Sequence, residues 1–158
     1  MPHELGDKII DVARKYIGTT EVTRNSGPLI DQWLHNVHCY PGDPWCVAFA
    51  WSMLDEATRI LGLPNPQRPT ASVHWLWRTA PIKAKTRDPI PGSIFCIDHG
   101  GGMGHCGIVV GKLPQNWQAI KTIEGNTSDD GSREGKSVCE RSRYIPEITL
   151  GYIDYSRL

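Results

Sequence analysis

A cysteine close to a predicted helix start is the first candidate for chemistry in this sequence. Asp43 is typical of a helix N-cap and Pro44 of a first helical position, so Cys46 is expected at the third helical position. Unpartnered backbone N–H groups and the helix dipole favour an anion there, and the thiolate is the nucleophilic form of cysteine. The Asp43 carboxylate opposes this effect. The alternative interpretation is that Cys46 is a small buried residue of an amphipathic helix.

A histidine and an acidic residue stand where two neighbouring strands could bring them together. His105 opens a predicted strand directly after the glycine-rich segment 100–104, Glu124 ends the next predicted strand, and Asn126 follows two residues later. A nucleophilic cysteine needs a base, and the base needs an orienting partner. If the two strands form a hairpin, His105 lies beside Glu124 or Asn126. The alternatives are a structural histidine and an ordinary turn.

A metal site is the strongest competing interpretation. Cys96, Asp98, His99, His105 and Cys106 are zinc-ligand types within eleven residues. Neighbours on a strand point to opposite faces, however, so His105 and Cys106 would not face the same ion. Cys96 and Cys106 equally suit buried apolar positions, where free cysteine is usually found. Thiol chemistry is therefore preferred, with no metal and no other cofactor.

The tryptophans raise the alternative of a binding module. There are six, Trp33, Trp45, Trp51, Trp75, Trp77 and Trp117. Most are expected in the core, because aromatic side chains dominate small cores. Trp45, beside Cys46, and Trp75 or Trp77 are the candidates to line a substrate cleft. A protein that only binds would not need Cys46.

Length and composition fit one globular domain. The chain has 158 residues, of which 39% are hydrophobic and 22% charged, which excludes a disordered tail and a membrane protein. Lys+Arg and Asp+Glu are both 17, so binding to nucleic acid or to a membrane surface by bulk charge is not expected. The first residues lack the basic start and apolar run of a signal peptide, which predicts synthesis in the cytoplasm without export by that route.

The order of elements predicts an α+β domain, with N-terminal helices packed on a C-terminal antiparallel sheet. Apolar spacing and end signals predict helices over residues 5–17, 28–37, 43–61 and from 70 to about 77. Alternation and turn residues predict strands over 93–97, 105–110, 117–124, 137–143 and 148–153. The glycine-rich segment 100–104 is expected to be a flexible loop that frees His105.

At these positions the sequence resembles the CHAP family, the cysteine- and histidine-dependent amidohydrolases and peptidases. The segment 44–49 (PWCVAF) is similar to the family's nucleophile helix, and 91–95 (PGSIF) with 104–109 (GHCGIV) to its strand pair with the histidine. The segment 124–127 (EGNT) is similar to its third motif. The resemblance runs in order from about residue 40 to 145, and residues 1–158 are expected to form a single such catalytic domain without a separate wall-binding domain.

The resemblance implies a papain-like fold and roles for particular residues. It makes Cys46 the nucleophile, His105 its general base and later general acid, Glu124 the residue that orients His105, and Asn126 a second polar support. It implies hydrolysis of amide bonds in bacterial peptidoglycan, as an endopeptidase or an N-acetylmuramoyl-L-alanine amidase. Some relatives bind calcium just upstream of the cysteine, but Asp43 is one carboxylate and too few for such a site.

The biological setting follows from the same resemblance. A monomeric phage endolysin that reaches the cell wall or periplasm after release, and lyses Gram-negative cells, is the favoured role. An injected antibacterial amidase effector is the alternative within the same chemistry. A zinc-dependent hydrolase or a non-catalytic wall-binding module is the alternative of another class. A regulatory disulfide between Cys39 and Cys46, seven residues apart, also stays open.

Overall fold

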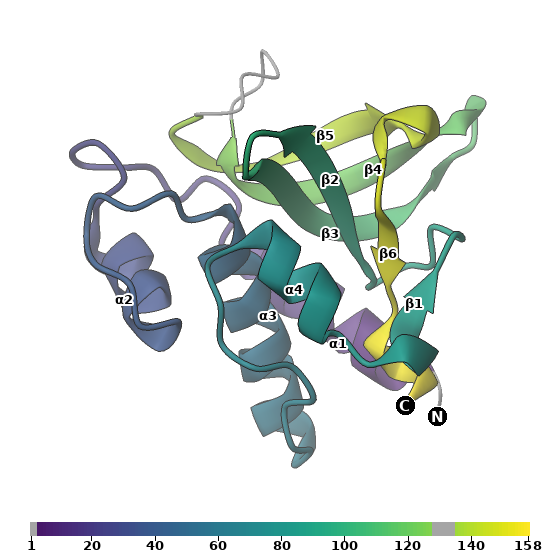
Figure 1. The fold of residues 1–158 in the computed structure, drawn as a ribbon, viewed down its shortest axis with the longest axis horizontal. Coiled ribbons are helices and arrows are strands. Elements are labelled where there is room, and N and C mark those ends of the chain that lie inside the picture. Colours follow the sequence, from purple (N-terminus) through teal and green to yellow (C-terminus); the bar gives the residue numbers. More distant parts are fainter. Residues whose placement is uncertain (1–2, 128–134) are drawn as a thin grey trace.

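The computed structural model describes residues 3–127 and 135–158. Its helices come first along the chain: α1 (Glu4–Lys15), α2 (Pro28–Asn36), α3 (Cys46–Leu61) and α4 (Val73–Thr79). The strands follow and form a curved sheet, and the helices lie on one side of this sheet (Figure 1). This arrangement confirms the predicted α+β class, with N-terminal helices packed on a C-terminal antiparallel sheet.

The sheet contains six antiparallel strands in the spatial order β1-β6-β2-β3-β4-β5. Their bounds are β1 (Lys85–Thr86), β2 (Ile94–Gly100), β3 (Met103–Leu113), β4 (Asn116–Thr127), β5 (Ser137–Tyr144) and β6 (Gly151–Ile153). Short 3-10 helices are η1 (Ile82–Ala84), η2 (Ile145–Glu147) and η3 (Tyr155–Arg157). The five predicted strands correspond to β2–β6. The two-residue β1 is too short to show an alternating pattern, and the sequence does not reveal it.

The main core lies between the helices and one face of the sheet. Along β2 and β3, Ile94, Cys96, Cys106 and Ile108 belong to this core, at the alternate positions that a strand turns to one face. The segment Cys46–Leu54 of α3 is buried at every residue. Packing on all sides therefore fixes the position of the start of α3.

A second, smaller apolar cluster covers the opposite face of the sheet. It is made of Phe95, Ile97, Val109, Ile120, Ile148 and Tyr152. These residues alternate along their strands with those of the main core, so β2, β3 and β4 are buried on both faces. Polar side chains on this second face are thus shielded from water.

Two helix starts differ from the prediction. α3 begins at Cys46 with Trp45 as its N-cap, and the Asp43 carboxylate instead accepts the backbone N–H of Tyr40 at 2.9 Å. α4 begins at Val73, where Ser72 caps it by accepting the Trp75 N–H at 3.4 Å. The predicted first residue of α4, Thr70, likewise uses its side chain within the turn, where its hydroxyl accepts the Ser72 N–H at 3.2 Å. The predicted C-cap is confirmed, because Gly62 has φ 70° in the left-handed region.

The glycine-rich segment is a tight hairpin and not the predicted flexible loop. β2 extends to Gly100 and β3 begins at Met103, so only Gly101 and Gly102 lie between them, with φ of 63° and 78°. Glycine adopts such angles without steric cost, which explains the composition of the turn. His105 consequently lies inside a strand and is 2% exposed.

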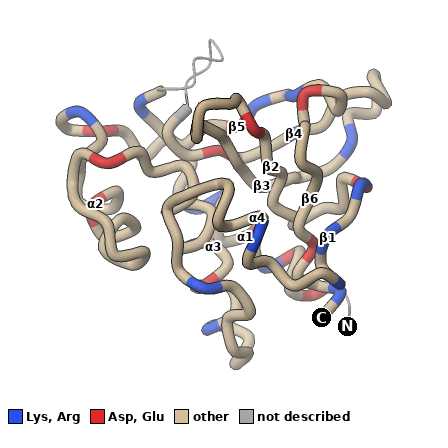
Figure 2. The backbone as a smooth tube through the Cα atoms, in the orientation of Figure 1, with Lys and Arg blue, Asp and Glu red and all other residues tan. Residues whose placement is uncertain are grey.

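Charged residues of both signs are interspersed along the described chain, on the helices and on the sheet (Figure 2). This distribution agrees with the formal net charge of zero. Among the described residues, no helix combines the length and the apolar character needed to cross a bilayer.

Candidate active site

Cys46 is the first residue of α3, closer to the helix start than the sequence predicts. The residue is 8% exposed and belongs to the main core. The first N–H groups of a helix have no intrahelical acceptor, and the helix dipole adds positive potential at the same end. The position therefore favours a thiolate.

Two glycines allow α3 and the strands to approach closely here. A Cβ atom on Gly125 of β4 would lie 2.7 Å from the Cβ of Phe49 and 2.9 Å from the ring of Trp45. A Cβ atom on Gly107 of β3 would lie 2.7 Å from the Cγ of Glu124 and 2.7 Å from the Phe95 ring. Side chains do not tolerate such distances, so only glycine lets the helix start and the strands pack as they do.

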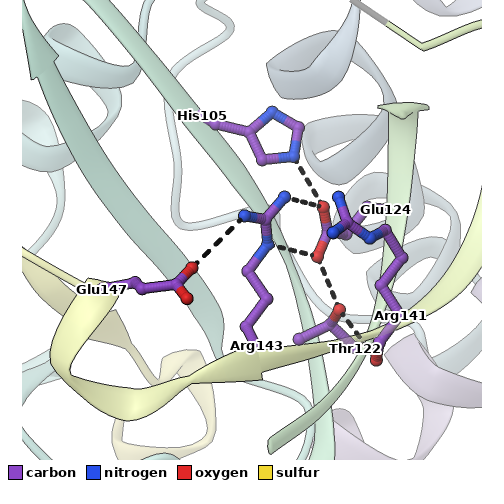
Figure 3. A network of polar contacts seen from close by, with 6 residues as sticks. All are labelled: His105, Thr122, Glu124, Arg141, Arg143 and Glu147. Atoms are coloured by element: carbon purple, nitrogen blue, oxygen red, sulfur yellow. Dashed lines mark hydrogen bonds and ion pairs between the residues drawn. The ribbon is translucent and has the colours of Figure 1, made fainter. Parts of the chain in front are cut away.

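The predicted contact between the histidine and the acidic residue is confirmed. Nε2 of His105 on β3 lies 2.7 Å from Oε1 of Glu124 on β4 (Figure 3). The β3–β4 ladder ends at the pair Ile108 and Ile123, and this side-chain bond links the strands beyond it. The exposed fractions of the two side chains are 2% and 0%. Because Nε2 donates to Glu124, Nδ1 is the ring nitrogen that remains for the thiol of Cys46.

The Glu124 carboxylate accepts hydrogen bonds at both oxygens. Oε1 accepts from His105 and from Nη2 of Arg143 at 2.7 Å. Oε2 accepts from Nε of Arg143 at 2.8 Å and from the Thr122 hydroxyl at 2.6 Å. Burial alone would raise the pKa of Glu124, but the hydrogen bonds and charges of Arg143 and His105 lower this pKa to about 2. Glu124 is therefore a fixed anion.

The thiol and the imidazole favour each other's charged form. A hydrogen bond from the Cys106 thiol lowers the pKa of Cys46 well below its ordinary value, and His105 lowers it further against the opposing effect of burial. Burial alone would lower the pKa of His105, but hydrogen bonds with Cys46 and Glu124, and their charges, raise this pKa to about 9. At neutral pH the site favours a Cys46 thiolate beside a His105 imidazolium.

Two further cysteines surround Cys46 as neutral thiols. The hydrogen bond to Cys46 and burial raise the pKa of Cys106. Burial also raises the pKa of Cys96, which pairs with Cys106 across β2 and β3. Cys106 can therefore donate its S–H to the Cys46 sulfur over the whole physiological pH range. The sequence analysis treats Cys106 only as a buried apolar residue or a metal ligand.

Asn126 lies next to this group, on an irregular part of β4. The β4–β5 register shifts between Glu124 and Thr127, and Asn126 has φ 54°, a left-handed angle that asparagine tolerates. Its side chain is 5% exposed, and its amide oxygen has no hydrogen-bond partner in the described part of the chain. An unpaired buried carbonyl is costly, so this oxygen is free to accept from a bound group.

The three tryptophans predicted to line a cleft lie in different environments. Trp45 is 0% exposed, stacks on Trp33 with ring centroids 5.9 Å apart, and donates its indole N–H to Glu21 at 3.0 Å. This burial contradicts the predicted contact of Trp45 with a substrate. Trp75 is 55% exposed. Trp77 is partly buried, with the Lys85 ammonium 5.1 Å from its ring centroid. Trp75 and Trp77 remain candidates.

The residues of the alternative zinc site are divided between the two faces of the sheet. Cys96 and Cys106 belong to the main core, whereas His105 pairs with Glu124 on the opposite face. His74 lies 3.3 Å from Asp98 at the surface. Within residues 3–127 and 135–158, no group of three or more His, Cys, Asp or Glu side chains has a metal-binding arrangement. All five cysteines are free thiols, Cys39 and Cys46 included.

Arg143 and Thr122 are site residues that the sequence analysis misses. Thr122 lies two residues before Glu124 on β4, so both side chains are on the same face of the sheet. Arg143 pairs with Ile120 across β4 and β5, four residues before Glu124, and is therefore on this face too. An arginine on the last predicted strand is an available signal. It becomes informative only once the register of β4 and β5 is known, since Arg143 reaches back along β4 to Glu124.

The fold and this group of side chains define a class of protein. A cysteine at the start of a helix that packs on an antiparallel sheet, with a histidine and a carboxylate on adjacent strands, is a papain-like arrangement. The model of the CHAP domain family matches residues 38–126, which is more than half of the chain, and the chain belongs to this family. Membership implies amidase or peptidase activity on peptidoglycan. Searches of the curated proteins and of the solved structures found no match.

Proposed function

We propose that this protein is a cysteine-dependent hydrolase that cleaves amide bonds of bacterial peptidoglycan, as an endopeptidase or an N-acetylmuramoyl-L-alanine amidase. One observation carries the proposal. The buried 2.7 Å contact between His105 and Glu124 stands beside a cysteine at a helix start whose pKa is lowered. This is the arrangement of a nucleophile, a proton-transfer group and an orienting residue.

Cys46 begins the reaction as a thiolate. Its sulfur attacks the amide carbonyl carbon, and the carbonyl oxygen takes up the electron pair. The backbone N–H of Cys46 at the start of α3 is a donor for this oxyanion. His105, already protonated, gives the proton on Nδ1 to the leaving nitrogen, so the amine departs and a thioester remains on Cys46.

Water completes the cycle. The neutral His105 takes a proton from water at Nδ1, and the hydroxide attacks the thioester carbonyl. Collapse of the second intermediate releases the carboxylic acid and returns the thiolate and imidazolium. Glu124 keeps its hydrogen bond to Nε2 throughout, which fixes the tautomer and the plane of the ring. The unpaired, buried amide oxygen of Asn126, two residues after Glu124, supports a role for Asn126 as a second polar group in this reaction.

Digestion of purified Gram-negative peptidoglycan, with mass spectrometry of the products, tests the proposal. Wild type is expected to release fragments, and Cys46→Ala is expected to lose at least about 10⁴-fold in rate while remaining folded. New amino termini on L-alanine would identify an amidase, and termini within the stem or crossbridge an endopeptidase. Cys39→Ala is the matched control and is expected to retain activity under reducing conditions.

Two outcomes would contradict the proposal. Equal digestion by wild type and Cys46→Ala would exclude thiol catalysis. Intact sacculi with both proteins folded, but with retained binding to sacculi, would indicate a wall-binding module instead.

The endolysin role is a second part of the proposal. We propose that the protein acts as a monomer on the wall after release through a pore, or alternatively after injection as an effector. Expression in Gram-negative cells is expected to cause lysis only when a pore-forming partner or an added export signal gives access to the wall. Lysis without such access would contradict this role.

A further inference from the structure

Arg143 is held in the interior against the group that contains Cys46, His105 and Glu124. Its side chain is 10% exposed, and its Nε and Nη2 atoms donate to both oxygens of Glu124, at 2.8 Å and 2.7 Å (Figure 3). The guanidinium also lies 5.6 Å from the centroid of the Phe95 ring. Nη1 lies 3.8 Å from the carboxylate of Glu147 on η2, which is 53% exposed. Arg143 thus connects the buried carboxylate to the surface of the molecule.

The bidentate contact settles two properties of Glu124. A planar guanidinium that donates to both oxygens fixes the plane of the carboxylate, and with it the direction in which Oε1 accepts from His105. A fully buried carboxylate without a cation would favour its protonated form, and then one oxygen would carry a proton. Two other donors reach Glu124. The Thr122 hydroxyl at 2.6 Å is neutral, and the charge of the His105 imidazolium at 2.7 Å is matched by the Cys46 thiolate, so Arg143 is the cation that balances Glu124.

We propose that Arg143 is a positioning residue of this site: it holds Glu124 as an oriented anion, and its charge balances the group formed by Cys46, His105 and Glu124. The inference rests on the proposed function, because it assigns Arg143 a part in the same reaction. Arg143 acts through Glu124 and does not touch the substrate.

The charges around the site determine what the loss of Arg143 would do. Arg143 interacts with Glu124 from β4 and Glu147 from η2, and its charge also acts on Cys46 from α3. The other titratable groups around Cys46 are His105 and Cys106 from β3 and Cys96 from β2, and Arg141 lies on the same strand as Arg143. A thiolate, an imidazolium, a carboxylate and a guanidinium sum to zero. Without the guanidinium the sum is negative, so a proton is held more tightly on both Cys46 and His105.

Arg143→Met and Arg143→Lys separate charge from geometry. In Arg143→Met, kcat is expected to fall on the order of 10- to 100-fold, because the His105 ring is less well oriented. Both limbs of its pH–rate profile are expected to move to higher pH by about one unit, because a nearby positive charge is lost. Arg143→Lys keeps the charge but not the bidentate contact. The two limbs of its pH–rate profile are therefore expected at the same pH as in wild type, while kcat is reduced.

The same shift is measured without any substrate. The rate of alkylation of Cys46 by iodoacetamide against pH, with the modified residue located by mass spectrometry, reports the thiolate fraction. Arg59→Met is the matched control, because Arg59 pairs with Asp55 at 3.1 Å at the other end of α3. It also removes one arginine and one ion pair, and neither profile is expected to move.

The double variant Glu124→Gln/Arg143→Met removes both charges and so avoids an unpaired charge in the interior. If Arg143 acts through Glu124, the double variant has the activity of Glu124→Gln alone. An additional tenfold loss in the double variant would overturn the inference. So would unshifted limbs of the activity or alkylation profile in a folded Arg143→Met. An inactive wild type whose alkylation profile still shifts in Arg143→Met would refute the proposed function and leave the inference standing.

Discussion

At the scale of single residues, the electrostatics of the site come from a few short contacts. Cys46 has a lowered pKa because Cys106 and His105 both stabilise its thiolate, and His105 has a raised pKa because Cys46 and Glu124 stabilise its imidazolium. The types and order of Cys46, His105 and Glu124 could be predicted from the sequence, since each stands close to an end of a predicted element with a recognisable signal. Cys106 and Arg143 could not, because their parts depend on strand register and on which face each strand turns to the helix.

The pH dependence of activity follows from these two shifts. Activity requires the Cys46 thiolate and the His105 imidazolium together. It is expected to fall above about pH 9, where His105 loses its proton, and to fall at low pH, where Cys46 gains one. Alkylation of Cys46 by iodoacetamide should accordingly reach its plateau well below pH 9. If the alkylation rate instead rose only near the ordinary pKa of a free thiol, the ion pair between Cys46 and His105 would be contradicted.

The Cys106 thiol makes the largest contribution to the lowered pKa of Cys46. In Cys106→Ala this hydrogen bond is lost, so the alkylation midpoint of Cys46 is expected to move to higher pH. Cys96→Ala is the matched control, because Cys96 is an equally buried thiol on the neighbouring strand. Equal midpoints in wild type and Cys106→Ala would show that the hydrogen bond does not stabilise the thiolate.

At the scale of elements, the helix start and the ends of two strands determine the site. The predicted elements α1, α2 and α3 and strands β2–β5 agree with the structure, because their apolar periodicity is long and bounded by Gly or Pro. The start of α3 is wrong by a few residues, since Asp43 forms a turn with Tyr40 and does not cap the helix. The tight hairpin between β2 and β3 is missed because a run of glycines indicates a backbone that can adopt many conformations and does not specify a particular turn.

Gly125 is a position where β4 lies close to the start of α3. In Gly125→Ala the added Cβ lies 2.7 Å from Phe49, so the helix start must move away from β4. The free energy of unfolding is expected to fall by about 1–3 kcal/mol, with a larger fractional loss of kcat. Denaturant unfolding and sacculus digestion measure the two effects.

Gly111→Ala is the control for this variant. Gly111 lies on β3, and a Cβ there meets nothing within 4 Å. Its unfolding free energy and activity are expected to stay close to those of wild type. If both alanine variants behave alike, the close approach at Gly125 has no role.

At the scale of the whole molecule, helices and sheet share one core, and the charged site residues form part of its interior. The core contains side chains from α1 to α4 and from β2 to β6. The α+β class could be predicted from element order alone. The second apolar cluster, on the face of the sheet that carries Glu124 and Arg143, could not, because its members lie far apart in the sequence and meet only when the strands pair.

The stability of the molecule is expected to depend on pH through Glu124. Its folded-state pKa is lowered from 4.5 to about 2, so its contribution is present above about pH 4.5 and is lost as the pH falls toward 2. Over this range the loss is about 3 kcal/mol. Glu124→Gln should therefore be less stable than wild type at pH 7, with the difference shrinking toward pH 3.

His105 gives the opposite dependence. Its folded-state pKa is raised from 6.5 to about 9, so its contribution is present below about pH 6.5 and is lost as the pH rises through 9. Urea unfolding of wild type and Glu124→Gln between pH 3 and 10 measures both effects. A constant stability difference across this range would refute the assignment of the charged pair.

The location of Arg143 on β5 determines where the chain can be cut without removing part of the site. The segment that matches the family model ends at residue 126, whereas the guanidinium that braces Glu124 comes from β5, after that segment. A fragment cut at the family boundary would keep the nucleophile, the histidine and the acid, yet leave a buried carboxylate without its cation. Chimeric proteins assembled from this catalytic unit therefore need a junction beyond Tyr155, because β6 pairs with β2 and Tyr155 belongs to the main core.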